Sequence, residues 1–462
     1  MARIVPSLLR SFQSRMINPT IVEFDTLTHA TEILPTLGTM ASSTFLSSFS
    51  GPMDFMSLRP QIRGNFPSSR SLAGAGASRT HLFDRVASRF QNSILSLKLL
   101  SRMKMIAAPL PPDSIDEVAG WPEVTTIYED KLQSIFQIVP PNQVFTSKTG
   151  KKYTTTYYTK KLIGADVANS EGFTGKGVIA AIPDTGGAPT HEQNLGMQFH
   201  STMREKGQFK DTNGHGEWCV SCVGGKHVDE RTFDVPVEGM APEVTLIGIK
   251  CLGFVMGIGF QSDIIEAMEY SIEQNADIVS MSLGSDSMPD NPDDDPEIKA
   301  VNELVSHDII PVIAAGNAGP DAKTIGTPGC APNALTVAAS DPIKGGIAPF
   351  SSRGPTKWGE VKPDVIAPGA DIYSGCVGLL DIVGDNVPNR YSILSGTSMA
   401  TPHIAGLLAC ARQFYATLGQ ILTVDMVKTI CQRYGNSKNT DVGWGYINWD
   451  WFKRYAADQG WV

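Results

Sequence analysis

Short apolar runs alternate with amphipathic stretches between residues 178 and 338, and this alternation restricts the fold more than any other feature of the sequence. Apolar residues at helical spacing predict helices over residues 264–272 and 298–305. Strands that alternate with helices form βαβ units, so we expect an α/β fold with a mostly parallel sheet between helices. The runs that predict its buried strands are residues 178–182, 244–249, 277–281, 309–314 and 334–338.

The composition limits the class of partner. Hydrophobic residues make up 42% of the chain and charged residues 18%, which suits a globular enzyme. The formal net charge is −9, and the first 105 residues hold an excess of basic side chains, which leaves an acidic remainder. We therefore expect no nucleic-acid partner, since phosphate binding needs clustered positive charge. No apolar run is long enough for a membrane span.

The start of the chain carries Arg3, Arg10 and Arg15 around a short, broken apolar run. This pattern predicts no secretory signal peptide and favours an intracellular location. The Arg/Ser-rich, acid-poor stretch up to Thr20 leaves two alternatives, a transit peptide or a plain disordered tail. The seven cysteines are expected to be reduced and buried rather than to bind a metal ion.

Changes in composition divide the chain into four parts. Residues 1–77 predict a basic head and linker of low order, to which we assign no fold. Residues 78–136 predict a small α+β domain, with a helix within 81–100, a strand-like stretch over 96–108, a helix at 113–118 and a strand at 123–128. Residues 137–160 are a connection and a processing region, and residues 161–462 hold the alternating pattern.

Three polar residues follow strands or begin helices in this pattern. Asp184 lies in an Asp-Thr-Gly run, His215 in Gly-His-Gly and Ser398 in Gly-Thr-Ser-Met-Ala. Taken singly, each run has a plainer interpretation as a turn, a loop or a helix N-cap. Together they can form a triad, in which an imidazole takes the serine proton and a buried carboxylate orients the imidazole.

These runs resemble the signatures of the subtilisin-like (S8) serine peptidases, in the chain order Asp, His, Ser. The resemblance covers about residues 155 to 455 and implies a subtilisin-like three-layer fold and an endopeptidase that uses Asp184, His215 and Ser398 on polypeptide substrates. Other matching blocks include Gly239-Met240-Ala241-Pro242, Ala314-Ala315-Gly316-Asn317, Phe350-Ser351-Ser352-Arg353-Gly354-Pro355 and Gly443-Trp444-Gly445-Tyr446.

The resemblance also implies the residues that surround the triad. Asn317 matches the family's oxyanion-hole asparagine, whose amide acts with the Ser398 backbone N–H. Gly326 matches the floor of the S1 pocket, where a glycine leaves room for a large apolar or aromatic P1 residue. His191 fits a position that is usually structural. The implied substrate-binding residues are Ser282, Leu283, Gly284, Ala315, Gly316 and Gly326.

The α+β domain of residues 78–136 resembles the family's propeptide, which docks on the catalytic domain, templates its folding and leaves its last strand in the substrate cleft. The resemblance implies a zymogen inhibited by its own propeptide. Residues 132–136 would then lie in the cleft with Phe136 in the S1 pocket, and autocleavage would follow Phe136.

Two features depart from the family pattern. Glu217 replaces the usual threonine of His-Gly-Thr, and its carboxyl group either points inward and raises the pKa of His215 or is solvated. The acidic run at residues 290–297 leaves three alternatives: a calcium site, attraction of basic substrates, or negative charge at a helix N-terminus. The chemistry requires no cofactor and no metal ligands are predicted, so calcium would be structural.

Two rival functions keep the same fold. A catalytically weak or inactive subtilase relative would act as a binding module. Absence of Ser398-dependent labelling by a fluorophosphonate probe would favour this function. An exopeptidase or transpeptidase would keep the nucleophile, and product analysis on an unstructured protein discriminates that function.

Overall fold

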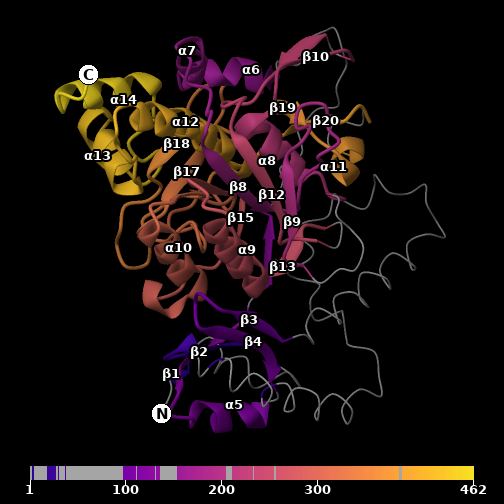
Figure 1. Ribbon diagram of the computed structural model, residues 1–462, viewed down its shortest axis with the longest axis vertical. Coiled ribbons are helices and arrows are strands. Elements are labelled where there is room, and N and C mark those ends of the chain that lie inside the picture. The colour runs from indigo at the N-terminus through magenta and orange to yellow at the C-terminus, as the bar shows by residue number, and fades with distance from the viewer. Residues whose placement is uncertain are drawn as a thin grey trace.

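The computed structural model describes residues 3–4, 18–27, 30, 37, 97–110, 112–130, 132–135, 153–203, 211–232, 234–253, 256–383 and 388–462. A small N-terminal unit lies beneath helices α9 (Gln261–Glu273) and α10 (Pro296–Ser306) of a larger α/β part, as Figure 1 shows. Within the described residues, none of the helices has the length and apolar character needed to cross a membrane.

A seven-stranded sheet forms the centre of the larger part, and all its strand pairs are parallel. Five of its strands are those predicted from the sequence, with ends shifted by one or two residues, whereas β9 and β18 were not predicted. In sheet order the strands are β18 (Val365–Pro368), β17 (Leu335–Ser340), β16 (Ile310–Ala314), β14 (Ile278–Met281), β8 (Ile179–Asp184), β12 (Thr245–Lys250) and β9 (Gln198–Ser201).

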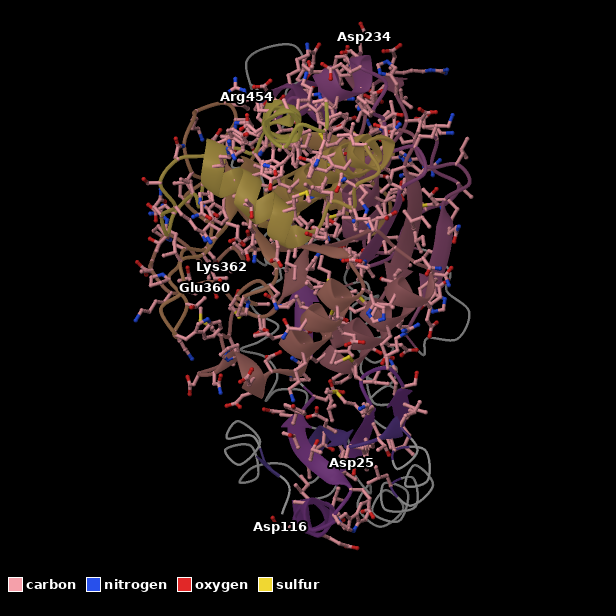
Figure 2. All side chains as sticks on the ribbon, turned by 60° about the vertical axis from the view of Figure 1, so that its left-hand side comes forward. Asp25, Asp116, Asp234, Glu360, Lys362 and Arg454 are labelled. Carbon is pink, nitrogen blue, oxygen red and sulfur yellow. The ribbon has the colours of Figure 1, made fainter. Side chains whose placement is uncertain are left out.

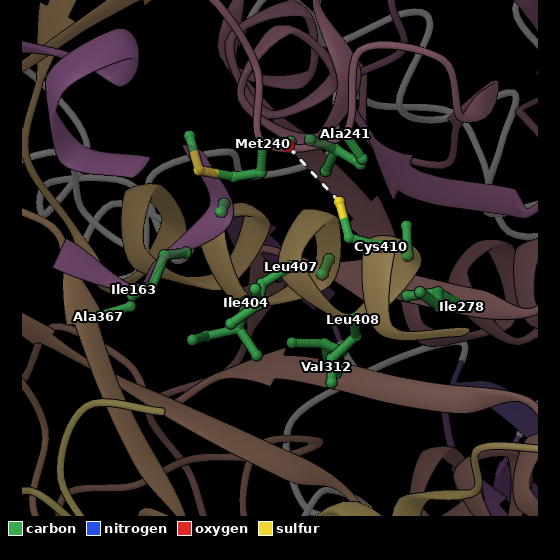
Figure 3. Packing of buried hydrophobic residues seen from close by; sticks show 14 of the residues in the cluster. Ile163, Met240, Ala241, Ile278, Val312, Ala367, Ile404, Leu407, Leu408 and Cys410 are labelled. Atoms are coloured by element: carbon green, nitrogen blue, oxygen red, sulfur yellow. Dashed lines mark hydrogen bonds between the residues drawn. The ribbon is translucent and has the colours of Figure 1, made fainter. Parts of the chain in front are cut away.

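Helices cover both faces of this sheet (Figure 1). Helices α8 (His215–Gly224) and α12 (Thr397–Thr417) pack together on one face, and α9 and α10 lie on the other. Successive side chains of β8 point to opposite faces of the sheet. Ile182 therefore belongs to the hydrophobic cluster around α12, and Ala181 belongs to the cluster under α9 and α10. Figure 3 shows Leu408 of α12 against Val312 of β16. The predicted α/β fold is thus confirmed.

Shorter elements complete the larger part. Helices α13 (Val424–Tyr434) and α14 (Trp449–Asp458) pack beside α12, together with α7 (Ala165–Ser170). Other short elements are β7 (Thr154–Thr155), α6 (Thr156–Thr159), the 3₁₀ helices Lys160–Leu162 and Pro292–Asp294, the hairpin β10 (Val228–Glu230) and β11 (Val235–Val237), β19 (Ile372–Gly375), α11 (Gly378–Val383) and β20 (Tyr391–Leu394). Because β7 pairs with β19, this part begins before residue 161, the boundary expected from the sequence.

The N-terminal unit contains a five-stranded sheet and helix α5 (Pro112–Ala119). Figure 2 shows Asp116 of α5 and Asp234, beside the β10–β11 hairpin, at opposite ends of the molecule. In sheet order the strands are β1 (Arg3–Ile4), β5 (Val124–Glu129), β2 (Asn18–Phe24), β4 (Met105–Leu110) and β3 (Lys98–Leu100).

The sequence-based boundaries of this unit need correction. Residues 1–77 were expected to have low order, yet β2 pairs with both β4 and β5 at the centre of the sheet. The β-branched run Thr20-Ile21-Val22 suits this central strand. The helix predicted within 81–100 falls largely outside the described residues, and its last residues form β3. The strand-like stretch at 96–108 is divided by a turn into β3 and β4.

Candidate active site

Asp184 is the last residue of β8, and His215 is the first residue of α8. The Nδ1 atom of His215 lies 2.8 Å from Oδ1 and 3.0 Å from Oδ2 of Asp184, and both side chains are fully buried. A carboxylate on Nδ1 leaves Nε2 as the ring atom that can accept a proton. Nε2 is buried and has no hydrogen-bond partner in the described parts of the chain.

A tight loop presents His215 at the start of its helix. Gly214 has φ 102°, and a Cβ atom on it would stand 1.9 Å from the Val377 carbonyl oxygen. Only glycine fits both this backbone conformation and this approach. The Asp211 carboxylate accepts hydrogen bonds from the backbone N–H groups of Gly214, at 2.7 Å, and Glu217, at 2.8 Å. Asp211 therefore fixes the loop, although burial raises the pKa of its carboxyl group.

Ser398 is the second residue of α12, and its Oγ donates a hydrogen bond to the Ser282 carbonyl oxygen at 3.2 Å. Pro402, four residues later, has no N–H to bond the Ser398 carbonyl oxygen. That oxygen instead accepts hydrogen bonds from Ser282 Oγ at 2.9 Å and Cys219 Sγ at 3.6 Å. These contacts hold the first turn of α12 against the strand end at Ser282 and against α8.

Asn317 lies directly after the apolar strand β16 and Ala315-Gly316. Its Oδ1 accepts hydrogen bonds from the Thr397 backbone N–H at 2.8 Å and from Thr397 Oγ1 at 3.0 Å. Thr397 Oγ1 in turn accepts one from the Gly316 backbone N–H at 3.1 Å. Because Oδ1 is held in this way, the side chain has one orientation beside Ser398, with its amide nitrogen as the donor atom. A Cβ atom on Gly396 would stand 3.3 Å from that nitrogen.

A three-stranded antiparallel sheet lies next to Ser282. Strand β6 (Leu132–Ile135) of the N-terminal region pairs with β13 (Ile258–Phe260) on one side and with β15 (Leu283–Gly284) on the other. Ile135 is opposite Leu283 in this register, so β6 ends one residue short of Ser282. The backbone edges of β13 and β15 thus bind an extended chain in the structure.

Gly326 is glycine for a reason that the sequence did not indicate. A Cβ atom on it would stand 1.5 Å from the Ser285 carbonyl oxygen, so the missing side chain allows the segment after β15 to approach. On that side the space is filled by backbone. The structure thus gives no support here to the argument that this glycine leaves room for a large P1 residue.

The sequence left two alternatives for Glu217, an inward carboxyl group that acts on His215 or a solvated one, and the structure fully matches neither. Its side chain is fully buried, yet within the described residues none of its hydrogen bonds goes to the His215 ring. It bonds instead to the backbone of Ala188 and to Asn194. Burial raises the pKa of Glu217 to about 8. Ala188 and Asn194 lie in the loop after β8, and the sequence singled out neither of them.

Ligand atoms of Asp184, His215 and Cys219 lie within 4.8 Å of one another, which makes them the candidate metal ligands of the described residues. Asp184 already bonds His215 Nδ1. Burial raises the pKa of the Cys219 thiol well above its ordinary value, which disfavours the thiolate that a metal ion needs. The donor set therefore fits a carboxylate–imidazole pair beside a buried thiol better than a metal centre.

The acidic run at residues 290–297 contains the N-cap of α10. Asp295 is buried, and its Oδ1 accepts hydrogen bonds from the backbone N–H groups of Glu297 at 2.9 Å and Ile298 at 3.3 Å. Asp295 thus matches the third alternative, negative charge at a helix N-terminus. Calcium binding and attraction of basic substrates stay predictions.

Comparison with known proteins places this geometry in a family. Residues 175–445 match the family model described as the subtilase family. The chain is 36% identical to serine protease AprX of Bacillus subtilis over 302 residues, which cover 61% of this chain and 67% of AprX. It is 36% identical to pyrolysin of Pyrococcus furiosus, over 50% of this chain and 19% of pyrolysin. It is 32% identical to subtilisin DY of Bacillus licheniformis, over 60% of this chain and 91% of subtilisin DY.

Proposed function

This chain belongs to the subtilase family and is a serine peptidase that hydrolyses peptide bonds, and from that premise we propose that Asp184, His215 and Ser398 are its catalytic triad. The observation that carries the proposal is the buried Asp184–His215 pair, whose Nε2 has no partner within the described residues. Ser398 supplies the nucleophile at the start of α12.

In the acylation step, Ser398 Oγ attacks the carbonyl carbon of the substrate while its proton moves to His215 Nε2. A C–O bond forms, and the carbonyl electron pair becomes an oxyanion. His215 then gives the proton to the leaving nitrogen as the C–N bond breaks. Water repeats the sequence on the acyl-enzyme and restores Ser398, so the net reaction consumes one water for each peptide bond.

We assign the oxyanion to the Asn317 amide nitrogen and the Ser398 backbone N–H. The bonds from Thr397 to Asn317 Oδ1 fix the amide before the substrate binds, so no reorganisation is needed during the reaction. Ser398 also lies in the first turn of α12, where the partial positive charge of a helix N-terminus favours an anion.

The substrate is proposed to bind as an extended strand between β13 and β15, where β6 lies in the structure. Main-chain hydrogen bonds of this kind select an extended backbone and are tolerant of side chains. Ser282, Leu283 and Gly284 supply one edge, while Ala315 and Gly316 lead to Asn317 on the adjoining side. Gly326 stays a prediction for the S1 pocket.

The triad is tested by labelling with a fluorophosphonate probe and by hydrolysis of an unstructured protein. Wild type should be labelled and should release internal fragments, whereas Ser398→Ala should do neither. His215→Ala should lose labelling as well, and Ser287→Ala, which changes an exposed serine, is the matched control. Labelling of Ser398→Ala equal to that of wild type would contradict the proposal.

We further propose that the chain is a zymogen whose N-terminal unit occupies the substrate cleft until the chain cuts itself. Strand β6 follows β5 of that unit and runs towards Ser282, which supports this proposal. Phe136, the expected cleavage residue, lies outside the described residues.

Polar contacts across the interface support specific docking of the N-terminal unit. Asp130, just before β6, accepts hydrogen bonds from the Ser262 backbone N–H at 3.0 Å and Ser262 Oγ at 2.7 Å, and so caps α9. Lys98 pairs with Asp263 at 2.6 Å, and both side chains are 9% exposed. Glu269 accepts a hydrogen bond from the Met103 backbone N–H at 3.0 Å.

Intact mass and N-terminal sequencing of purified wild type and Ser398→Ala test the zymogen proposal. Wild type should show a new terminus between about residues 131 and 160, and Ser398→Ala should keep its full length. Identical products from the two proteins would contradict self-cleavage. If the two proteins give identical products but Ser398 of wild type is still labelled, only self-cleavage is contradicted and the triad proposal is unaffected.

A further inference from the structure

We propose that Glu217 is a positioning residue for the Asp184–His215 pair, because its buried carboxyl group joins the helix that carries His215 to the loop that follows Asp184. The inference rests on the proposed catalytic role of these residues. It concerns a carboxyl group at the place where the family pattern has a threonine.

The carboxyl group spans two segments that carry the triad. Its Oε2 accepts a hydrogen bond from the Ala188 backbone N–H at 2.5 Å, and its Oε1 accepts one from Asn194 Nδ2 at 2.7 Å. Ala188 is four residues after Asp184, and Glu217 is two residues after His215. A shift of α8 relative to the loop therefore breaks these bonds as well as the bond between Asp184 and His215.

A buried histidine shows which form of Glu217 the cluster needs. His191 Nε2 lies 2.8 Å from the Arg390 carbonyl oxygen and donates to it, so Nδ1 carries a lone pair, which accepts from the Gln193 N–H at 3.3 Å. That Nδ1 is 3.4 Å from Glu217 Oε1. Two acceptors repel each other at this distance, and the repulsion is larger for a carboxylate than for a neutral carboxyl group, so the contact favours the protonated form of Glu217.

The titration of both groups agrees with a neutral pair. Burial lowers the pKa of His191 to about 4 and raises the pKa of Glu217 to about 8, so both are uncharged at pH 7. The charged or titratable groups that face Glu217 are His191 from the loop after β8, Asp211 from the loop before α8, Cys376 from the segment after β19, and Arg390 from the segment before β20.

Ionisation of Glu217 then has a direct consequence. As pH rises through about 8, Glu217 loses its proton and places a negative charge 3.4 Å from the His191 Nδ1 lone pair and near Asp211. Both repulsions oppose the close approach of Glu217 to these groups and so strain the packing of α8 against the loop. Because small misplacements of catalytic groups cost large factors in rate, we expect kcat to fall above this pH.

The test compares Glu217→Gln and Glu217→Ala with wild type and with Glu303→Gln, a partly exposed control on α10. The glutamine amide resembles the protonated acid: it carries no charge, its oxygen can accept from Ala188, and its NH₂ can donate to Asn194. Asn194 can turn its amide over, because its Oδ1 has no partner in the described residues. The values of kcat and KM for a peptide substrate are measured from pH 6 to 10, together with fluorophosphonate labelling.

We expect Glu217→Ala to lower kcat by about 10- to 100-fold with KM changed by less than about threefold. Glu217→Gln should keep most of the wild-type kcat at pH 7. It should also lack the fall in kcat that wild type shows above about pH 8. Identical pH profiles for wild type and Glu217→Gln would overturn the inference, and that comparison remains decisive if Glu217→Ala does not fold.

Labelling separates this inference from the proposed function. If wild type is not labelled at Ser398, the triad fails and the inference falls with it. If wild type is labelled but Glu217→Ala matches Glu303→Gln in kcat, the triad stands and only the positioning role of Glu217 is overturned.

Discussion

Ser398 Oγ donates its hydrogen bond to the Ser282 carbonyl oxygen, while His215 Nε2 has no partner in the described residues. The proton transfer that the proposed mechanism needs therefore requires the Ser398 side chain to turn towards the imidazole. Staggered rotamers of a serine interconvert readily, and catalytic hydrogen bonds often tighten only when substrate is bound. The proposed mechanism therefore includes a change of the Ser398 rotamer before the proton is transferred.

Asn317 gives a test at the scale of a single residue. Asn317→Ala should lower kcat by about 10²–10³ with little change in KM, because the amide acts on charge that develops only in the transition state; the magnitude is that of a donor removed in a subtilisin, a relative of this chain. Asn333→Ala, an exposed asparagine, is the matched control. Equal kcat values for the two variants would exclude Asn317 from the oxyanion site, and thermal unfolding checks that the lost Thr397 bonds have not unfolded the chain.

At the scale of elements, helix α10 begins at a buried acidic cap. Asp295→Ala removes the acceptor for the Glu297 and Ile298 N–H groups and should lower the free energy of unfolding by about 0.5–2 kcal/mol. Asp293→Ala, an exposed neighbour, should change it by less than about 0.5 kcal/mol. Chemical denaturation with and without EDTA measures both. If EDTA lowers the free energy of unfolding of wild type as much as Asp295→Ala does, calcium binding by residues 290–297 is favoured instead.

The contact between the N-terminal sheet and α9 should depend on pH. Burial raises the pKa of both Asp130 and Glu269 to about 7, above their ordinary values, so the docked state holds protons that an undocked state releases. Docking of the N-terminal unit is therefore strongest below about pH 4. It weakens as pH rises from about 4 to about 7, and above that it no longer depends on these two groups. In this window each group changes the equilibrium constant for docking by up to about tenfold per pH unit.

Backbone hydrogen exchange of uncut Ser398→Ala measures this dependence, with protection of α9 and β6 corrected for the intrinsic exchange rate at each pH. Asp130→Asn and Glu269→Gln should each flatten the curve. Protection that is constant from pH 5 to 8 in the uncut protein would contradict the prediction.

At the scale of the whole molecule, β2 is separated from β4 by about 80 residues of chain and from β5 by about 100, but lies between them in the sheet. Its side chains serve both faces. Ile21 joins the core under α9 and α10, and Val22 joins the core beneath α5. Loss of β2 therefore damages the N-terminal sheet and its docking surface together.

Removal of residues 1–77, up to the boundary that the sequence suggested, should thus abolish self-cleavage and Ser398 labelling of the expressed chain. Removal of residues 1–4, which eliminates only the short edge strand β1, should be tolerated far better, because an edge strand has one neighbour and β2 has two. Intact mass and labelling of the two truncated chains provide the comparison. Equal behaviour would show that β2 is dispensable.

Local patterns predicted much of the fold and of the candidate site. The apolar runs of β8, β12, β14, β16 and β17 are long, continuous and buried on both faces, and their ends were found to within two residues. β9 was missed because its residues are only partly buried, so its sequence lacks a continuous apolar run. β18 is a four-residue strand that contains a proline, which weakens its strand pattern.

By itself the sequence determined the family, the α/β class and the residues proposed for the triad, because each depends on short runs whose chemistry is readable locally. Only the tertiary structure decided that β2 completes the N-terminal sheet, that Gly326 admits the backbone at Ser285, and that Glu217 turns to Ala188 and Asn194. Each of these depends on which segment, remote in the chain, fills the space beside a residue. That outcome follows from packing of the whole core, and no local pattern contains it.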